Sequence, residues 1–231
     1  MVFNSVFSVA INLEFTSIAT SAGIDGKLQV MSPDKLPEID NDRIACQQIL
    51  AEDHSVFSIQ WLVIPQGITA ELTSDRLLRL YLDYIERFTL GLIRSVTAEE
   101  GVEFRLGGSS LAIIKFSPPI SEKTADGEKS TLRISGGLLV QPKECARGQL
   151  DFMIESLDAG SRVTLKLSDY CPLILGSSRP SLWRKWLYRL TQAYLHKTVT
   201  IRFLAMVYRQ ATGNRLKKDV VRIAVRKGKE T

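Results

Sequence analysis

The chain has 231 residues, of which 45% are apolar and 24% charged, so it can bury a sizeable core and is neither disordered nor of low complexity. No apolar run approaches the roughly 18 to 20 uncharged residues that a membrane-spanning helix needs, which argues against a transmembrane protein. The net charge of +5 hides an asymmetry: residues 178–231 hold 14 basic and two acidic side chains, a net of +12, which leaves −7 for residues 1–177.

The first third of the chain mixes strand-like and helix-like patterns. Residues 2–19 are typical of an early strand or strand pair, and Glu14 together with the lack of a basic start argues against a signal peptide. A polar stretch then leads to a short helix expected over residues 42–51. The clearest strand is 55–65, where alternate apolar residues share one face and Pro65 ends the run.

An amphipathic helix is predicted over residues 74–96. Thr73, Ser74 and Asp75 offer an N-cap, and apolar residues recur at helical spacing up to about Val96. This helix is expected to cover a core.

The next seventy residues have the pattern of an antiparallel sheet. Alternation and turn residues predict the strands 102–106, 111–116, 132–140, 149–155 and 162–168, with a loop over 118–129. Residues 158–160 form the turn of the last hairpin, and Gly136-Gly137 is interpreted as a bulge or bend. The alternation places Asp151 on the face opposite Phe152, hence outside.

A long C-terminal helix is predicted over residues 182–211. Its apolar stripe runs through Leu204 and Tyr208, while His196 is placed on the polar side, facing solvent. Gly213 is a suitable stop. Residues 212–231 form a basic tail in which 221–225 can make a short edge strand.

These elements predict the α+β class, with a curved antiparallel sheet packed by helix 74–96 and helix 182–211. The hairpin 149–168, the break at 172–180 and the final helix resemble the helix-grip fold of the Bet v1 and START-like (SRPBCC) superfamily. The resemblance covers about residues 74–211, which would be the core of a single domain 1–211 with residues 1–70 as an extension. It implies an apolar cavity between sheet and helix for lipids, hormones or polyketides, and some members are cyclases.

No catalytic, metal or cofactor motif stands out. The two histidines, His54 and His196, have no nucleophile motif around them, and Asp53-His54 is interpreted as a solvated loop pair. Cys46, Cys145 and Cys171 show neither a disulfide framework nor metal-ligand spacing, which favours the reducing cytosol and a cytoplasmic protein.

The leading functional prediction is a noncatalytic protein that binds a hydrophobic small molecule between the sheet and the long helix. The residues expected to line that pocket or to fill the core are Phe152, Ile154, Val163, Leu165, Trp183, Leu187, Leu190 and Tyr194.

Two alternatives stay open. The basic helix and tail can bind nucleic acid, an anionic membrane surface or an acidic protein, or can face the acidic half of their own chain. The anion-binding candidates are Arg184, Lys185, Arg189, Arg202 and Arg209. A cyclase-like enzyme would instead need polar groups such as Asp151, Tyr170 or Arg133 facing the cavity. Ligand identity and oligomeric state do not follow from the sequence.

Overall fold

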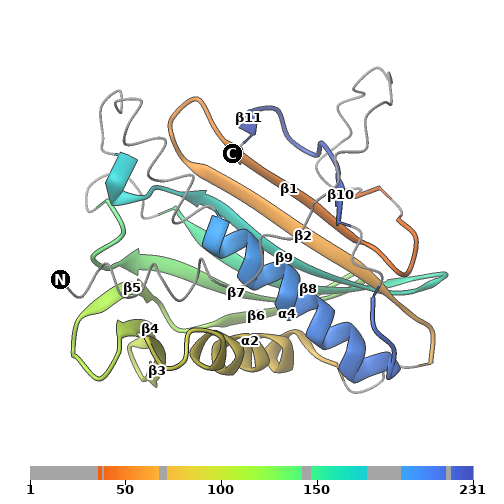
Figure 1. The fold of residues 1–231 in the computed structure, drawn as a ribbon, viewed down its shortest axis with the longest axis horizontal. Helices are drawn as coiled ribbons and strands as arrows, with labels where there is room; N and C mark the ends of the chain where they lie inside the picture. The colour runs from red at the N-terminus through yellow and green to blue at the C-terminus, as the bar shows by residue number, and fades with distance from the viewer. Residues whose placement is uncertain are drawn as a thin grey trace.

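The computed structural model describes residues 36–37, 39–67, 72–141, 147–175, 194–216 and 220–230. They form an α+β fold in which a large curved sheet is packed by two helices (Figure 1). The strands are β1 (Ile44–Leu50), β2 (Val56–Pro65), β3 (Ile93–Ala98), β4 (Gly101–Leu106), β5 (Ala112–Phe116), β6 (Ile120–Thr124), β7 (Gly127–Gly136), β8 (Gln149–Leu157), β9 (Gly160–Tyr170), β10 (Val220–Arg222) and β11 (Lys229–Glu230). The helices are α2 (Ser74–Phe88), α4 (Tyr194–Thr212) and the short 3-10 helix η1 (Leu173–Leu175).

The sheet has the strand order β10-β1-β2-β9-β8-β7-β5-β4-β3, with β11 also paired to β1 and β6 to β7. Every pairing in this path is antiparallel except that of β1 with β10. The predicted meander is therefore confirmed, and β2 inserts beside β9, so an early strand lies in the middle of the sheet.

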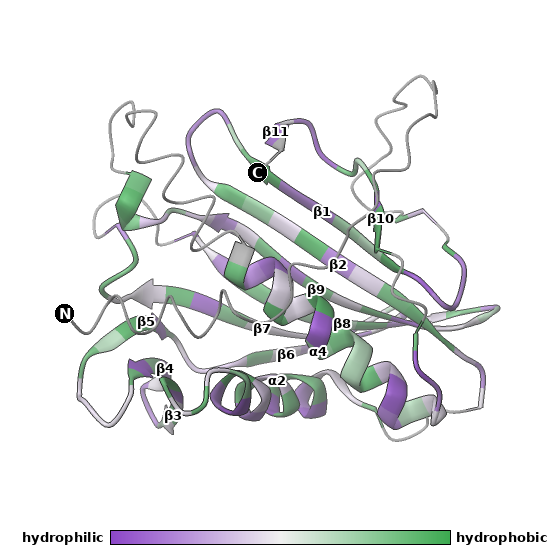
Figure 2. Cartoon of the chain, viewed as in Figure 1, coloured by the Kyte–Doolittle hydropathy of each residue, from purple (hydrophilic) through white to green (hydrophobic). Residues whose placement is uncertain are grey.

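Each face of the sheet around β2 packs against a separate apolar core. Val56, Leu62 and Ile64 join α2 and α4 in the larger core, whereas Phe57, Ile59 and Trp61 point to the opposite face. Leu36, Ile39, Ile223 and Val225 pack on that second face. Figure 2 shows the resulting bands of hydrophobic and hydrophilic residues along β1 and β2. The face that carries α2 and α4 is called the helix face below.

The helix predicted over residues 74–96 is wrong in its last third. Thr73 caps α2 as expected, its hydroxyl oxygen accepting from the Arg76 amide at 3.2 Å. The helix ends at Phe88 because Leu90 (φ +52°) and Gly91 (φ +77°) take the left-handed conformation that closes a helix. Residues 93–98 then form β3.

Three other local predictions needed correction. Residues 42–51 contain the strand β1 and no helix; all seven residues of β1 are buried, so the alternation typical of a half-exposed strand is missing. The segment expected as a loop over 118–129 contains β6 and the start of β7. The strand placed at 132–140 ends earlier, at Gly136.

Gly136 and Gly137 mark the end of β7, in agreement with the predicted bend. The register between β5 and β7 shifts at this point. Gly137 has φ +118°, and a Cβ atom there would lie 2.6 Å from the Ile113 carbonyl oxygen, so the close approach of the two backbones requires glycine. The bend therefore depends on the absence of a side chain.

The described part of the C-terminal tail is tied to β1. β10 runs parallel to β1, with Ile44 opposite Val220, and β11 pairs with the other end of β1. Between them, Gln47 Oε1 accepts from the amides of Val225 and Arg226, each at 2.8 Å, and Gln47 Nε2 donates to the Arg226 carbonyl at 2.7 Å. The edge strand expected near 221–225 thus forms at 220–222.

The two described cysteines differ in state. Cys46 is buried beside Gln60, and Cys171 is disulfide-bonded. The count and spacing of cysteines did not predict a disulfide, and disulfides persist mainly in oxidising compartments. The cytoplasmic location, which depended on that count, stays a prediction. No helix in the described ranges is long and apolar enough to cross a membrane.

Candidate functional site

The described length of the predicted C-terminal helix, α4, presents one buried face to the sheet. Residues 199, 200, 203, 204, 207 and 208 are buried, a spacing of three and four that continues back to His196. This face packs on β2 and β1, and Phe203 also meets Tyr81 of α2 with ring centroids 5.1 Å apart. α4 therefore closes the helix face of the sheet, as predicted, while residues 182–193 lie outside the described residues.

His196 is half-buried and not fully exposed to solvent as predicted. Its Nε2 atom is buried and has no hydrogen-bond partner. Burial lowers the pKa of the imidazole to about 4, so the ring is neutral at physiological pH. The buried face is rotated relative to the predicted stripe: Val199 and Thr200 are buried, whereas Ile201 is only partly buried.

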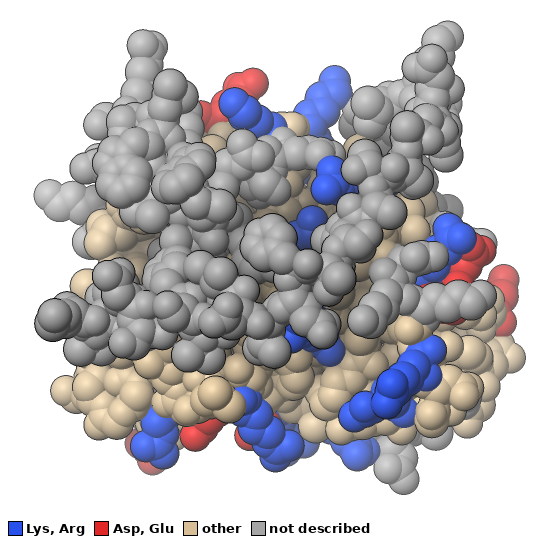
Figure 3. Space-filling model, viewed as in Figure 1, with Lys and Arg blue, Asp and Glu red and all other residues tan. Residues whose placement is uncertain are grey.

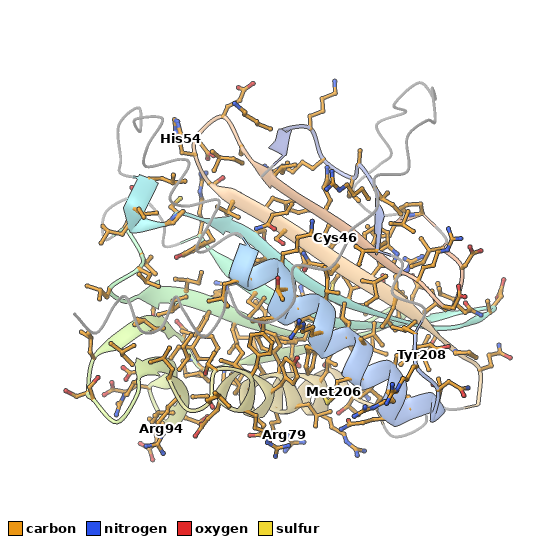
Figure 4. The ribbon with its side chains drawn as sticks, viewed as in Figure 1. Cys46, His54, Arg79, Arg94, Met206 and Tyr208 are labelled. Atoms are coloured by element: carbon orange, nitrogen blue, oxygen red, sulfur yellow. The ribbon has the colours of Figure 1, made fainter. Side chains whose placement is uncertain are left out.

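The sheet opposite α4 contributes a set of polar side chains. Gln60 of β2 is fully buried, and its Nε2 donates to Ser58 Oγ at 2.7 Å and lies 3.7 Å from Cys46 Sγ. Cys46 and Ser58 share the helix face with Gln60, since their strand neighbours Ile44, Val56 and Leu62 belong to the larger core. Among the described residues, Gln60 Oε1 has no hydrogen-bond partner. Figure 4 shows Cys46 on β1, whereas His54 lies in the turn between β1 and β2.

Thr200 adds a third unpartnered polar atom to this interface. Its side chain is fully buried, and its hydroxyl makes no hydrogen bond of ordinary geometry. Burial raises the pKa of Tyr81 on α2 to about 12, and the Thr200 side chain, which lies next to the Tyr81 hydroxyl, lowers that pKa in part. We call Cys46, Ser58, Gln60, His196 and Thr200 the interface cluster.

Unpartnered buried polar atoms are rare in folded proteins because each costs desolvation energy, about 1–3 kcal/mol for a neutral group. Two of them, on His196 and Thr200, belong to α4, and a third, on Gln60, belongs to β2, on which α4 packs. The interface cluster is therefore the candidate functional site.

Sequence reasoning missed the interface cluster, although one signal was present. Residues 61–64 of β2 are continuously apolar, which is typical of a strand buried on both faces. Gln60, directly before that run, is then a buried polar residue in a central strand. Such a residue needs a partner.

The pocket residues predicted on the sheet lie around this cluster. Phe152, Ile154, Val163 and Leu165 are all buried in the larger core on the helix face. Phe152 meets the Tyr81 ring at 5.3 Å. Trp183, Leu187 and Leu190 lie outside the described residues, as does the side chain of Tyr194. That the four sheet residues contact a ligand stays a prediction.

Asp151 is on the face opposite Phe152, as predicted, but it is fully buried and not outside. Its carboxylate accepts from the Thr131 hydroxyl at 2.8 Å and pairs with Lys166 at 3.1 Å. Arg133, a second candidate for an inward polar group, is exposed. Tyr170 is buried and donates its hydroxyl to the Leu139 carbonyl at 2.9 Å. Two of the three groups that a cyclase site would need therefore do not reach the helix face.

The opposite face also holds unpartnered polar atoms. Trp61 and Thr164 are direct neighbours across β2 and β9, and both are fully buried. The indole Nε1 of Trp61 and the hydroxyl of Thr164 have no hydrogen-bond partner. Thr164 therefore provides a matched comparison for Thr200, because the same buried hydroxyl stands on the other side of the sheet.

Of the predicted anion-binding residues, the structure describes Arg202 and Arg209. They lie two turns apart on α4, both exposed, and the Arg202 guanidinium stands 5.7 Å from the centroid of the Phe88 ring. Figure 3 shows Lys and Arg side chains gathered over the end of α4. Arg184, Lys185 and Arg189 lie outside the described residues, so anion binding by this set stays a prediction. Among the described residues, no group of three His, Cys, Asp or Glu could hold a metal ion.

Comparison with known proteins gives a likeness in structure alone. No protein-family model and no curated protein matches the sequence. Among solved structures, the chain is similar to CalU16 from Micromonospora echinospora, with 12% identity, coverage of 73% of this chain and 84% of that chain, and a TM-score of 0.32.

Proposed function

We propose that the protein is a noncatalytic binding protein that holds a largely apolar small molecule between α4 and the sheet. The observation that carries this proposal is the unpartnered carbonyl oxygen of Gln60, fully buried in the contact between the sheet and α4. A ligand hydrogen bond to that oxygen would offset its desolvation cost.

The surroundings of the interface cluster favour an apolar ligand body. The larger core combines aliphatic residues of the sheet with the aromatic rings of Tyr81, Phe152 and Phe203. Ligand sites in proteins are typically apolar, with a few polar groups that fix orientation. The interface cluster supplies polar groups of this kind from α4, β1 and β2.

The arrangement of elements supports the same proposal. A helix that follows the last strand of the meander and packs on one face of a curved sheet is the arrangement that the helix-grip resemblance implied (Figure 1). In that superfamily the ligand lies between the sheet and this helix. The position of the interface cluster agrees with that expectation.

Native mass spectrometry, followed by extraction with organic solvent, tests the proposal. Protein purified without detergent is expected to carry a copurifying apolar molecule. The Thr200→Val variant is expected to lose most of it, because valine keeps the shape of threonine and removes the hydroxyl. Thr164→Val makes the same change on the opposite face of the sheet and is expected to retain the molecule. An empty wild-type protein, or equal loss in both variants, would contradict the proposal.

A further inference from the structure

We infer that the polar end of the bound molecule is uncharged, as in an alcohol or a carboxamide, and that it donates a hydrogen bond to Gln60 Oε1. This inference rests on the proposed function and names the class of ligand for the same site. It follows from the charges and hydrogen-bonding groups that the helix face offers.

Buried charge lies on the other side of the sheet. Among the described residues, the buried charged side chains are Asp151 and Arg162. Asp151 alternates with Phe152 and pairs with Lys166, and Arg162 alternates with Val163 and lies 3.6 Å from Glu155. Phe152 and Val163 belong to the core on the helix face, so both charges point away from it. A charged ligand group in the described interface would have no buried counter-ion there.

The unpartnered Gln60 Oε1 further restricts which polar group a bound ligand can carry. Gln60 Oε1 is a carbonyl oxygen and only accepts hydrogen bonds, so its partner must carry an O–H or N–H group. An ionised carboxylate or a phosphate diester has no such donor. A neutral alcohol or carboxamide has such a donor.

The imidazole of His196 does not supply a positive charge at neutral pH. Its ring is held neutral by burial, as described above, so it offers an anion no charge. An ammonium group could donate to Gln60 Oε1, but it would be buried without an acidic partner, which is far more costly than burying a neutral hydroxyl. Both signs of charge are therefore disfavoured.

One basic residue lies near enough in sequence to require a control. Lys197 follows His196 on α4 and is partly exposed. If its ammonium group reached the ligand, a carboxylate would be favoured over an alcohol, and removal of the charge would abolish that preference. The variant Lys197→Gln is expected to leave the ligand preference unchanged.

The test compares three ligands that share a ten-carbon chain: 1-decanol, decanoate and decylammonium. Each is titrated at pH 7.5 into protein stripped of bound molecules and loaded with N-phenyl-1-naphthylamine, a neutral fluorescent probe whose displacement is measured. Decanol is expected to bind about tenfold or more tightly than either ion. Decanol can form the hydrogen bond to Gln60 Oε1 without burying a charge, and one such bond corresponds to about a tenfold difference in affinity. Equal or tighter binding of decanoate or decylammonium would overturn the inference.

Substitutions at Gln60 make the test specific to this site. Gln60→Leu is expected to weaken decanol binding about tenfold, the effect of one lost hydrogen bond. Gln60→Glu keeps the shape and introduces a carboxylate, so it is expected to shift the preference toward decylammonium. Unchanged ligand preference in both variants would overturn the assignment of Gln60.

The molecule extracted from the native protein separates failure of this inference from failure of the proposed function. A carboxylic acid, phosphate or amine in the extract would keep the binding function and overturn the inference. A neutral alcohol or amide supports both. An empty protein that also binds none of the three decyl compounds would remove the proposed function itself.

Discussion

The buried imidazole of His196 is expected to make the stability of the protein depend on pH. The ring is neutral in the folded protein, where burial lowers its pKa from 6.5 to about 4. In the unfolded chain the ring regains its ordinary pKa. The unfolded state therefore binds a proton between about pH 6.5 and pH 4 that the folded state does not, and stability falls as the pH falls through this window.

The size of this effect follows from the pKa difference. One pKa unit corresponds to about 1.36 kcal/mol, so the full loss below pH 4 is about 3 kcal/mol. At pH 5, where the unfolded ring is almost fully protonated and the folded ring is not, the loss is about 2 kcal/mol relative to pH 8. Asp53, whose pKa hydrogen bonds from Ser55 lower to about 2, loses its contribution only below pH 4.

Urea unfolding at pH 8 and pH 5 measures this loss. The wild-type protein is expected to lose about 2 kcal/mol, and His196→Gln is expected to lose much less because glutamine does not titrate. The chain has one other histidine, His54, which stands in the β1–β2 turn with φ +64°. The control His54→Asn tolerates that backbone conformation and should keep the wild-type pH dependence. Parallel stability curves for wild type and His196→Gln would refute the buried neutral imidazole.

Three further predictions concern the fold around the site. Thr164→Val should raise the free energy of unfolding by about 1 kcal/mol because it removes an unpartnered hydroxyl. Thr131→Val should lower the free energy of unfolding by about 1–2 kcal/mol because the buried Asp151 carboxylate loses a hydrogen-bond donor. Urea titration of both variants tests this difference in sign. Gly137→Ala should lower the free energy of unfolding by about 3 kcal/mol. Gly107 has φ +53° but open space around it, so Gly107→Ala should lower the free energy of unfolding by only about 1 kcal/mol. Equal losses of stability in thermal unfolding would contradict the steric argument. Gln47→Leu should speed hydrogen exchange at the two amides that Gln47 binds about tenfold or more, while exchange in α4 stays unchanged.

The meander could be predicted because its strands carry local signals. In β8 and β9, apolar residues alternate with polar ones, and Asp158-Ala159 forms the two-residue turn that links them. These features depend only on neighbouring residues. The pairing of β2 with β9 joins residues more than 90 positions apart, such as Leu62 and Val163, so no local sequence pattern predicts this pairing.

Where both faces of a strand are covered, alternation no longer reports exposure. β1 was mistaken for a helix because residues of both its faces are buried. Asp151 was placed on the correct face, but the sequence did not reveal that this face is covered as well. The buried ion pair with Lys166 depends on three-dimensional contacts that the alternation pattern does not contain.

The candidate site could be predicted only in its apolar part. The alternation in the hairpin predicts that Phe152 and Val163 point into the core, and both are buried on the helix face. His196 was missed because an imidazole among basic residues is typical of a solvated helix surface. The partial burial of His196 depends on which side of α4 packs on the rest of the fold, and the local sequence does not contain that information.

The pairing of residues 220–230 with β1 has a consequence for synthesis. Ile44 pairs with Val220, which follows 176 positions later, so the outer backbone of β1 stays unpaired until residues 220–230 have been made. An unpaired edge of this kind is a template for pairing with another chain. Nascent or truncated protein that lacks residues 220–230 is therefore at risk of aggregating through β1, because this edge is covered only after those residues have been made.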